Sequence, residues 1–156
     1  MIGLDLIPIN DQGRPVDFDG DMTDLMYEVG DQYAQMAAGQ PYEDPWIGYF
    51  ARIQGTKDIV GTCGFKSSPS ESRVEIAYHT FPGHEGKGYA NIMARKLVLL
   101  AEKTNPLLTI VAQTLQEQNA STKILKNIGF QKTADLDHPY DGPVWEWTLD
   151  LRRKTF

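Results

Sequence analysis

The stretch Glu85–Ala90 is the best candidate for chemistry, because two glycines flank a lysine where a strand-like pattern gives way to a helical one. The first turn of a helix leaves backbone N–H groups without partners, and the helix dipole places partial positive charge there. Glycines at 86 and 88 allow a bulky anion to approach those N–H groups without meeting a Cβ atom. The turn therefore predicts a binding site for a phosphate or pyrophosphate group.

The kind of phosphate ligand is narrowed by two motifs that this turn does not match. A P-loop requires Gly-Lys followed by Ser or Thr, whereas Lys87 is followed by Gly88. The dinucleotide fingerprint requires a third glycine at the place of Asn91. The usual ATP and NAD motifs are therefore absent, and a nucleotide-binding domain of another kind stays an alternative.

A strand and a helix position the turn. Residues Arg73–Phe81 alternate as in a half-buried strand, with Glu75 and His79 on one face and Tyr78 on the other. Apolar residues then recur at three- and four-residue spacing from Tyr89 to Ala101, which predicts an amphipathic helix. The turn thus connects a central strand to a helix N-terminus.

The rest of the chain is predicted to form a sheet around this unit. We expect strands at Leu4–Ile9, Trp46–Ile53, Ile59–Phe65, Leu107–Thr114, Phe130–Ala134 and Val144–Leu151, and helices at Met22–Ala38 and Asn119–Ile128. This order predicts a mixed α/β sheet in which strands 73–81 and 107–114 are parallel neighbours joined by a helix. The loop Gly39–Pro45 suits either a substrate-side wall or a plain connector.

Length and composition limit the class of protein. With 156 residues the chain can bury one core, so we expect a single domain at 1–156. The net charge of −6 at pH 7 weighs against nucleic acid or an anionic membrane as a partner. No apolar stretch approaches membrane-spanning length, which favours the cytoplasm. One cysteine and three histidines lack ligand spacing, so no metal site is predicted.

At the glycine turn the sequence resembles the GNAT acetyltransferases, whose acetyl-CoA signature reads Gln/Arg-x-x-Gly-x-Gly/Ala. Gly88 and Ala90 match its last two fixed places, whereas Glu85 departs from the first. We expect the Glu85 carboxylate to point to solvent, because it would repel a pyrophosphate. The run VEIAYHTFPGHEGKGYA is most similar to the RimJ/RimL-like branch. The resemblance implies the GNAT fold, in which strands 73–81 and 107–114 splay apart to admit the cofactor.

A second match lies downstream, and the resemblance then spans roughly residues 46–134. Ser121 precedes Gly129-Phe130 by eight residues, as in many GNAT chains. The family Asn aligns with Gln118, although the adjacent Asn119 can serve with a one-residue shift. Leu125 stands where many GNAT enzymes have a tyrosine general acid. A leucine cannot donate a proton, so that version of the mechanism does not apply.

The resemblance implies a set of acetyl-CoA contacts in the strand end, the turn and the second helix: His79, Phe81, Gly86, Lys87, Gly88, Tyr89, Ala90, Asn119 and Ser121. Glu75 resembles glutamates that act as general bases in the family, and an exposed or ion-paired strand glutamate is the alternative. His79 is the next candidate base. Ser121 can help protonate the leaving thiolate, hydrogen-bond the cofactor or cap its helix. A backbone N–H near Tyr78–Thr80, freed by a strand bulge, is expected to bind the thioester oxygen.

Two classes of function follow from the resemblance. The first is an acetyl-CoA-dependent N-acetyltransferase that moves the acetyl group by direct attack of a primary amine, either a peptide N-terminus or a small molecule. The second is a non-catalytic acyl-CoA-binding module or sensor, which Leu125 favours. The resemblance is also compatible with a homodimer.

Overall fold

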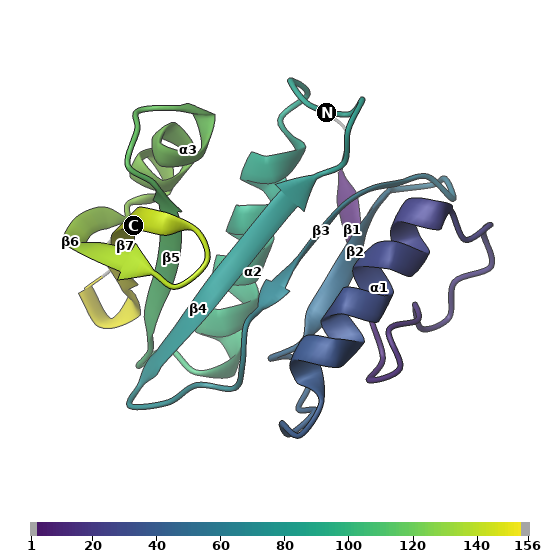
Figure 1. The fold of residues 1–156 in the computed structure, drawn as a ribbon, viewed down its shortest axis with the longest axis horizontal. Helices are drawn as coiled ribbons and strands as arrows, with labels where there is room; N and C mark the ends of the chain where they lie inside the picture. The colour runs from purple at the N-terminus through teal and green to yellow at the C-terminus, as the bar shows by residue number, and fades with distance from the viewer. Residues whose placement is uncertain (1–2, 154–156) are drawn as a thin grey trace.

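The computed structural model describes residues 3–153, which form one seven-stranded mixed sheet with helices on both faces (Figure 1). The strands are β1 (Leu4–Pro8), β2 (Gly48–Ile53), β3 (Ile59–Phe65), β4 (Arg73–Thr80), β5 (Thr109–Leu115), β6 (Gln131–His138) and β7 (Gly142–Asp150). The helices are α1 (Asp24–Ala37), α2 (Tyr89–Thr104), α3 (Ala120–Ile128) and a 3₁₀ turn at Leu151–Arg153. The strands lie in the order β1-β2-β3-β4-β5-β7-β6, which confirms the predicted mixed sheet.

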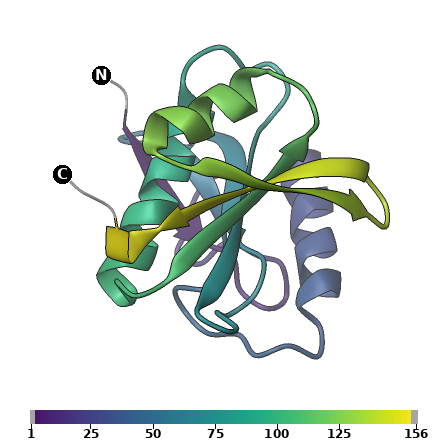
Figure 2. The same cartoon turned by 90° about the vertical axis from the view of Figure 1, so that its left-hand side faces the viewer.

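Helices α1 and α2 cover opposite faces of the sheet (Figure 2). The larger core cluster packs α2 residues such as Met93 and Leu97 against Val74 and Ile76 of β4. The smaller cluster includes Met26 of α1 and Phe81 at the end of β4. The alternation predicted for β4 is therefore confirmed, because its even-numbered side chains face α2 and its odd-numbered ones face α1.

The sheet opens between β4 and β5. These strands are parallel neighbours, as predicted, but pair only where residues 73–75 meet residues 109–111. Beyond Glu75, β4 continues to pair with β3 as far as Thr80, while β5 pairs with β7 along its whole length. Each strand thus follows its own half of the sheet, and a gap widens toward their C-terminal ends.

Helix α1 is unbroken although Gly30 lies inside it. A Cβ atom at Gly30 would overlap the carbonyl oxygen of Gly13, which belongs to the loop that follows β1. Gly30 is therefore the residue that allows this loop to pack directly on the helix. The low helix propensity of glycine is the cost of that contact.

Several predicted boundaries are wrong by one to four residues, in two cases because turns use the N–H groups at the start of a strand. Trp46 N and Ile47 N donate to turn carbonyls, so β2 begins only at Gly48. Leu107 N donates to the side chain of Asn105, so β5 begins at Thr109. The predicted loop at 138–142 is shorter, because β6 continues to His138. In residues 3–153 no helix is long and apolar enough to span a membrane.

Candidate active site

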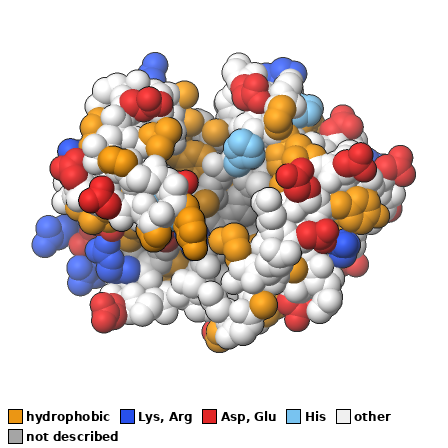
Figure 3. All heavy atoms as spheres, viewed as in Figure 1, with side chains coloured by type: hydrophobic (Ala, Val, Ile, Leu, Met, Phe, Trp, Pro, Cys, Tyr) orange, Lys and Arg blue, Asp and Glu red, His pale blue; other side chains and the backbone are white. Residues whose placement is uncertain are grey.

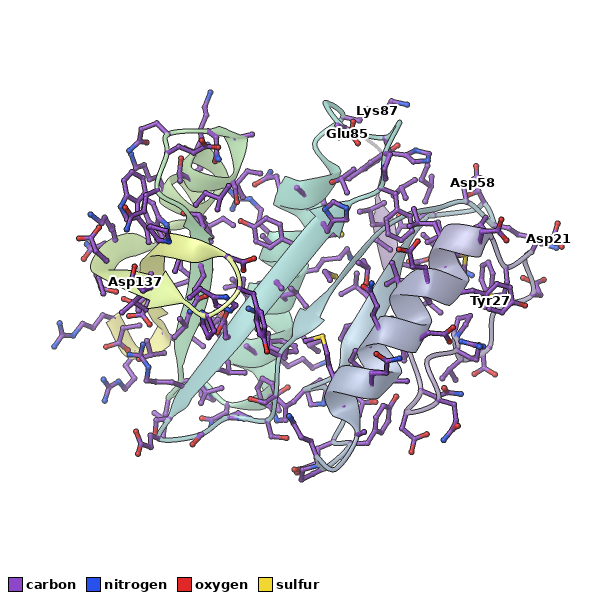
Figure 4. All side chains as sticks on the ribbon, viewed as in Figure 1. Asp21, Tyr27, Asp58, Glu85, Lys87 and Asp137 are labelled. Carbon is purple, nitrogen blue, oxygen red and sulfur yellow. The ribbon has the colours of Figure 1, made fainter. Side chains whose placement is uncertain are left out.

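The glycine turn has the open geometry that an anion site requires. Gly86 and Gly88 have φ of +79° and +83°, and a Cβ atom at either position would meet no atom within 4 Å. Gly88 is the N-cap of α2 and supplies no side-chain cap, whereas α1 and α3 are capped by side chains. The first-turn N–H groups of α2 thus face open space. Glu85 is exposed, as predicted, and Figure 4 shows it with Lys87 at the outer end of the turn.

The edge of β4 that faces the gap offers backbone donors. N–H groups alternate sides along a strand. Phe81 N donates to Val60 O on β3, so the N–H groups of Tyr78 and Thr80 point the other way, toward the diverging β5. The predicted bulge is not present, because the β3–β4 register runs without a shift from Ile76 to Thr80. Divergence of β5, rather than a bulge, leaves these donors without a strand partner.

A hydrogen bond crosses the gap between β4 and α3. The hydroxyl oxygens of Tyr78 and Ser121 lie 3.3 Å apart. Burial raises the pKa of Tyr78 above its ordinary value, and the hydrogen bond from Ser121 opposes that shift in part. Leu125 lies one helical turn after Ser121 and is fully buried in the core. Tyr78 therefore places a phenol beside α3, the helix in which Leu125 stands where many GNAT enzymes have a tyrosine.

The sequence did not predict this contact between Tyr78 and Ser121. The only signal was the place of Tyr78 on the face of the strand opposite to Glu75, and that signal does not reveal how far β5 diverges. Of the roles considered for Ser121, helix capping is wrong, because Asn119 is the N-cap of α3.

Glu75 is ion-paired and half-buried. Its Oε2 atom lies 2.6 Å from Nζ of Lys66, and 24% of its side chain is exposed. Lys66 follows β3, and its backbone N–H donates to the Glu75 carbonyl oxygen, so the two strands hold the pair together. The predicted base is thus positioned next to the gap with its charge already balanced. His79, the other candidate base, is exposed on the same face of β4.

Other predicted cofactor residues differ in what they can offer. Asn119 Oδ1 accepts from Thr122 N and its amide nitrogen donates to Glu117, so its side chain is engaged locally. Phe81 and Tyr89 are buried, which leaves only their backbones near the turn. Ala90 is half-buried in the first turn of α2. Within residues 3–153, no group of three or more His, Cys, Asp or Glu side chains could hold a metal ion.

A pocket of about 220 Å³ lies on the α1 face of the sheet, and we call it the α1 pocket. It is lined by parts of α1, the loop after it, β3 and residues 77–79 of β4. Gly48, Gly64 and Ala77 are direct partners across β2, β3 and β4, so three strands meet there with no side chain larger than a methyl group. The ring of Tyr33 packs over Gly48. Figure 3 shows this face hollowed between the two halves of the molecule and rimmed by hydrophobic side chains.

The sequence did not predict the α1 pocket as a whole, because its floor depends on strand register. Residues 40–42 of the preceding loop do line it, which favours the substrate-side interpretation of that loop over a plain connector.

Two parallel strands that splay beside a glycine turn at a helix N-terminus define the class of fold that the sequence resemblance implied. A profile of the GNAT acetyltransferase domain matches residues 19–131, and the chain belongs to that family. It is 35% identical over 81 residues to the uncharacterised N-acetyltransferase p20 of Bacillus licheniformis, a match covering 51% of this chain and 46% of p20. The chain therefore spans about half the length of the curated relatives it matches.

Solved structures share the fold over nearly the whole chain. A spermidine N-acetyltransferase SpeG chimera from Vibrio cholerae and human SSAT superposes with a TM-score of 0.68, 14% identity and 96% coverage of both chains. The yncA protein of Salmonella typhimurium, a putative acetyltransferase solved with its cofactor acetyl-CoA, superposes with a TM-score of 0.63 and 15% identity. The match covers 100% of this chain and 97% of that chain. At these identities the likeness shows the fold alone.

Proposed function

We propose that this protein transfers the acetyl group of acetyl-CoA to a primary amine by direct attack, and that it is a member of the RimJ/RimL-like branch. The observation that carries the proposal is the opening of the sheet beyond Glu75, directly beside the uncapped N-terminus of α2. Open Cβ directions at Gly86 and Gly88 fit a pyrophosphate there. The acetyl-CoA bound to the yncA fold and the match to VEIAYHTFPGHEGKGYA support the same reading.

Bound acetyl-CoA would supply an acetyl thioester, whose C–S bond breaks as a C–N bond forms, with the sulfur gaining a proton and the amine nitrogen losing one. The backbone N–H groups of Tyr78 and Thr80 are placed to donate to an oxygen that develops negative charge in the gap. Gly86, Lys87 and Gly88, with the first turn of α2, are placed to hold phosphate.

Removal of the amine proton falls to Glu75 or His79. Glu75 Oε2 lies 2.6 Å from Nζ of Lys66, so a substrate ammonium group has to compete with Lys66 for this carboxylate. His79 lies in the wall of the α1 pocket, and an imidazole can accept a proton there. We assign Glu75 as the base, and His79, exposed in the wall of the α1 pocket, is the alternative.

Proton delivery on the leaving side is assigned to Tyr78, with Ser121 as its hydrogen-bond partner. A phenol in a half-buried site stays protonated at neutral pH and can donate to a sulfur that gains negative charge. This assignment removes the difficulty posed by Leu125, because the proton donor comes from β4 instead of α3.

The decisive experiment measures thermal unfolding with acetyl-CoA, CoA, NAD or ATP, followed by transfer to a panel of amines. A ligand at a hundredfold above its Kd stabilises the folded state by about 2.7 kcal/mol, roughly 5–10 °C for a chain of this length. We expect a shift with both CoA forms and none with NAD or ATP. Native protein should release CoA in the presence of an accepted amine, and Glu75→Gln should release it at least about 100-fold more slowly.

A second candidate is a non-catalytic acyl-CoA-binding module, which the fully buried Leu125 favours. It predicts the same thermal shifts with CoA but no amine-dependent release of CoA by the native protein. That combination would overturn the enzyme proposal and leave cofactor binding intact.

A further inference from the structure

The α1 pocket lies where an acceptor would have to sit. Its wall includes Ala77, Tyr78 and His79, the segment of β4 that has lost its pairing with β5. A molecule held in the pocket therefore lies next to the strand edge to which the proposed function assigns the thioester. Helices α1 and α2 lie on opposite faces of the sheet (Figure 2). The pocket is lined by α1, whereas the glycine turn caps α2, so the two sites approach the gap from opposite sides.

The size of the pocket limits what it can hold. A dry protein cavity of about 150 Å³ accommodates a benzene molecule. The α1 pocket, at about 220 Å³, has room for one ring or one branched alkyl group with a short chain. Its bottom stays empty because the Gly48–Gly64–Ala77 row carries no larger side chain, and a Cβ atom at Gly64 would press on the Ile47 backbone.

The chemistry of the wall is apolar and aromatic. Tyr33 and Tyr42 are among the lining residues, with Met36 at the rim. Trp46 and Phe65 also line the pocket, although their rings pack edge to face on each other at the larger core cluster. The two tyrosine hydroxyls are already bonded to the backbone, since Tyr33 accepts from Gly48 N and Tyr42 donates to Ile9 O. The aromatic part of the wall therefore offers mainly contact area. Apart from tyrosines, the polar lining residues are Gln40, Thr62, Lys66, Ser67 and His79.

Charge in the pocket argues against a polycation. Among the described residues that line it, none is Asp or Glu, and the one Lys or Arg is Lys66. Glu75, the nearest assigned carboxylate, is occupied by that lysine. A second ammonium group would lose its hydration here without gaining a carboxylate partner, and Lys66 would repel it.

We infer that the α1 pocket is the acceptor site and that it selects a primary amine carrying a single compact apolar group, aromatic or branched aliphatic, over a polyamine. The inference rests on the proposed acetyl transfer, and it differs from what the fold neighbour that acts on spermidine would suggest. The same chemistry is present in a free arylalkylamine and in a peptide whose N-terminal side chain is apolar.

The test compares 2-phenylethylamine, 3-methylbutylamine, spermidine and tripeptides beginning with Leu or Ser. We expect the apolar amines or the Leu peptide to exceed spermidine and the Ser peptide in kcat/KM by at least about tenfold. If the free apolar amines have the higher kcat/KM, the acceptor is a small molecule; if the Leu peptide has the higher value, the acceptor is a peptide N-terminus. Isothermal titration of the same compounds into the CoA-bound protein should give the same order without requiring turnover.

A matched pair of variants separates the pocket from a general charge effect. Met36→Asp places a carboxylate at the rim, where the native side chain is 67% exposed, and Leu107→Asp does the same at a site of 64% exposure outside the pocket. Met36→Asp should strengthen spermidine binding more than phenylethylamine binding, because spermidine carries further ammonium groups, and should shift the ratio of the two binding constants about tenfold, whereas Leu107→Asp should leave that ratio unchanged.

Two results would overturn the inference: native protein that prefers spermidine, or a Met36→Asp variant with an unchanged ratio of the two binding constants. Failure of the proposed function looks different, because CoA would bind and no amine would be acetylated. In that case the order of the amine affinities, measured by isothermal titration, still tests whether the α1 pocket prefers an apolar amine to spermidine.

Discussion

At the scale of single residues, Tyr78 links the two halves of the site. Its backbone N–H faces the gap, and its hydroxyl reaches Ser121 on the far side. Burial raises its pKa above the ordinary value, so the phenol keeps its proton at neutral pH. A neutral donor fixed by a partner on another element is what a leaving thiolate requires.

We therefore predict that Tyr78→Phe lowers kcat by about 100-fold and changes the KM for acetyl-CoA much less, because only the hydroxyl is removed. Because the folded-state pKa is raised, the native contribution of Tyr78 persists below its ordinary value near 10 and is lost only as pH rises through the higher value. The native kcat should thus show no alkaline decline from Tyr78 between about pH 7 and 9. Steady-state kinetics across this range measure both quantities.

Tyr140→Phe is the matched control, since that ring is 92% exposed in the β6–β7 turn and should leave kcat unchanged. If the Tyr78→Phe variant kept the native kcat, Tyr78 would not be the proton donor. A fall in melting temperature without a fall in kcat would assign the hydrogen bond to stability alone.

The candidate site was only partly predictable at this scale. Glu75, His79 and Ser121 could be named because strand alternation and motif spacing are local properties of the sequence. The Lys66–Glu75 ion pair and the Tyr78–Ser121 bond join residues on different elements. The distances between these partners depend on strand register and on the divergence of β5, and neither can be predicted from the sequence of one segment.

At the scale of elements, the turn between β4 and α2 holds three glycines with positive φ and open Cβ directions, at 83, 86 and 88. Only Gly88 is the N-cap of α2. The similar φ values of Gly83 (+88°) and Gly88 (+83°) make Gly83 an internal control for the strain that any side chain would suffer there.

We predict that Gly88→Ala and Gly83→Ala each destabilise the fold by about 1–2 kcal/mol, because both force a side chain into the left-handed region. Gly88→Ala should in addition weaken CoA binding by at least about tenfold, since its methyl group enters the space beside the first-turn N–H groups. Calorimetric titration with CoA separates the two effects. Equal affinities in the two variants would mean that the pyrophosphate does not bind at the N-cap of α2.

Helix α1 offers a second prediction at this scale, through Gly30. Alanine is the better helix former by about 1 kcal/mol, yet its Cβ would overlap the Gly13 carbonyl. We predict that Gly30→Ala lowers stability by about 1–3 kcal/mol, measured by chemical denaturation. Because α1 carries Tyr33 and Met36, the KM for the amine should rise as well.

The exposed α1 position Gln35 provides the comparison, and Gln35→Ala should change stability by less than about 0.5 kcal/mol. A stabilised Gly30→Ala would show that the loop at Gly13 moves away at little cost, and that the close approach does not position α1.

The order and type of the elements were predictable, and their ends were not. Apolar periodicity located the helices and most strands, and a nearly continuous apolar run located β5, whereas β6 buries almost none of its residues. The ends moved where a turn captured an N–H group, as at Ile47 and Leu107. Gly30 lowers the helix propensity of the α1 segment, yet α1 is unbroken there, and the close approach of the loop at Gly13 requires a glycine at this position.

At the scale of the whole molecule, the protein consists of two half-sheets that share three residue pairs. Strands β1–β4 form one half and β5–β7 the other, and they meet only at residues 73–75 and 109–111. Helix α2 spans the junction, because Met93 and Leu97 belong to the same cluster as Ile110 and Ala112 of β5. A ligand that fills the gap would therefore contact both halves at once, and its binding energy would hold them together.

We predict that CoA slows amide hydrogen exchange at Tyr78, Thr80 and the first turn of α2, because these N–H groups lack strand or cap partners in the free protein. Exchange measured over seconds to minutes should stay unchanged in β1, an edge strand at the far side of the sheet, which serves as the internal control. ATP at the same concentration should protect neither region. If protection were confined to the first turn of α2, with Tyr78 and Thr80 still exchanging freely, the ligand would lie outside the gap. The acetyl group would then not reach the edge of β4, next to which the α1 pocket would hold the amine.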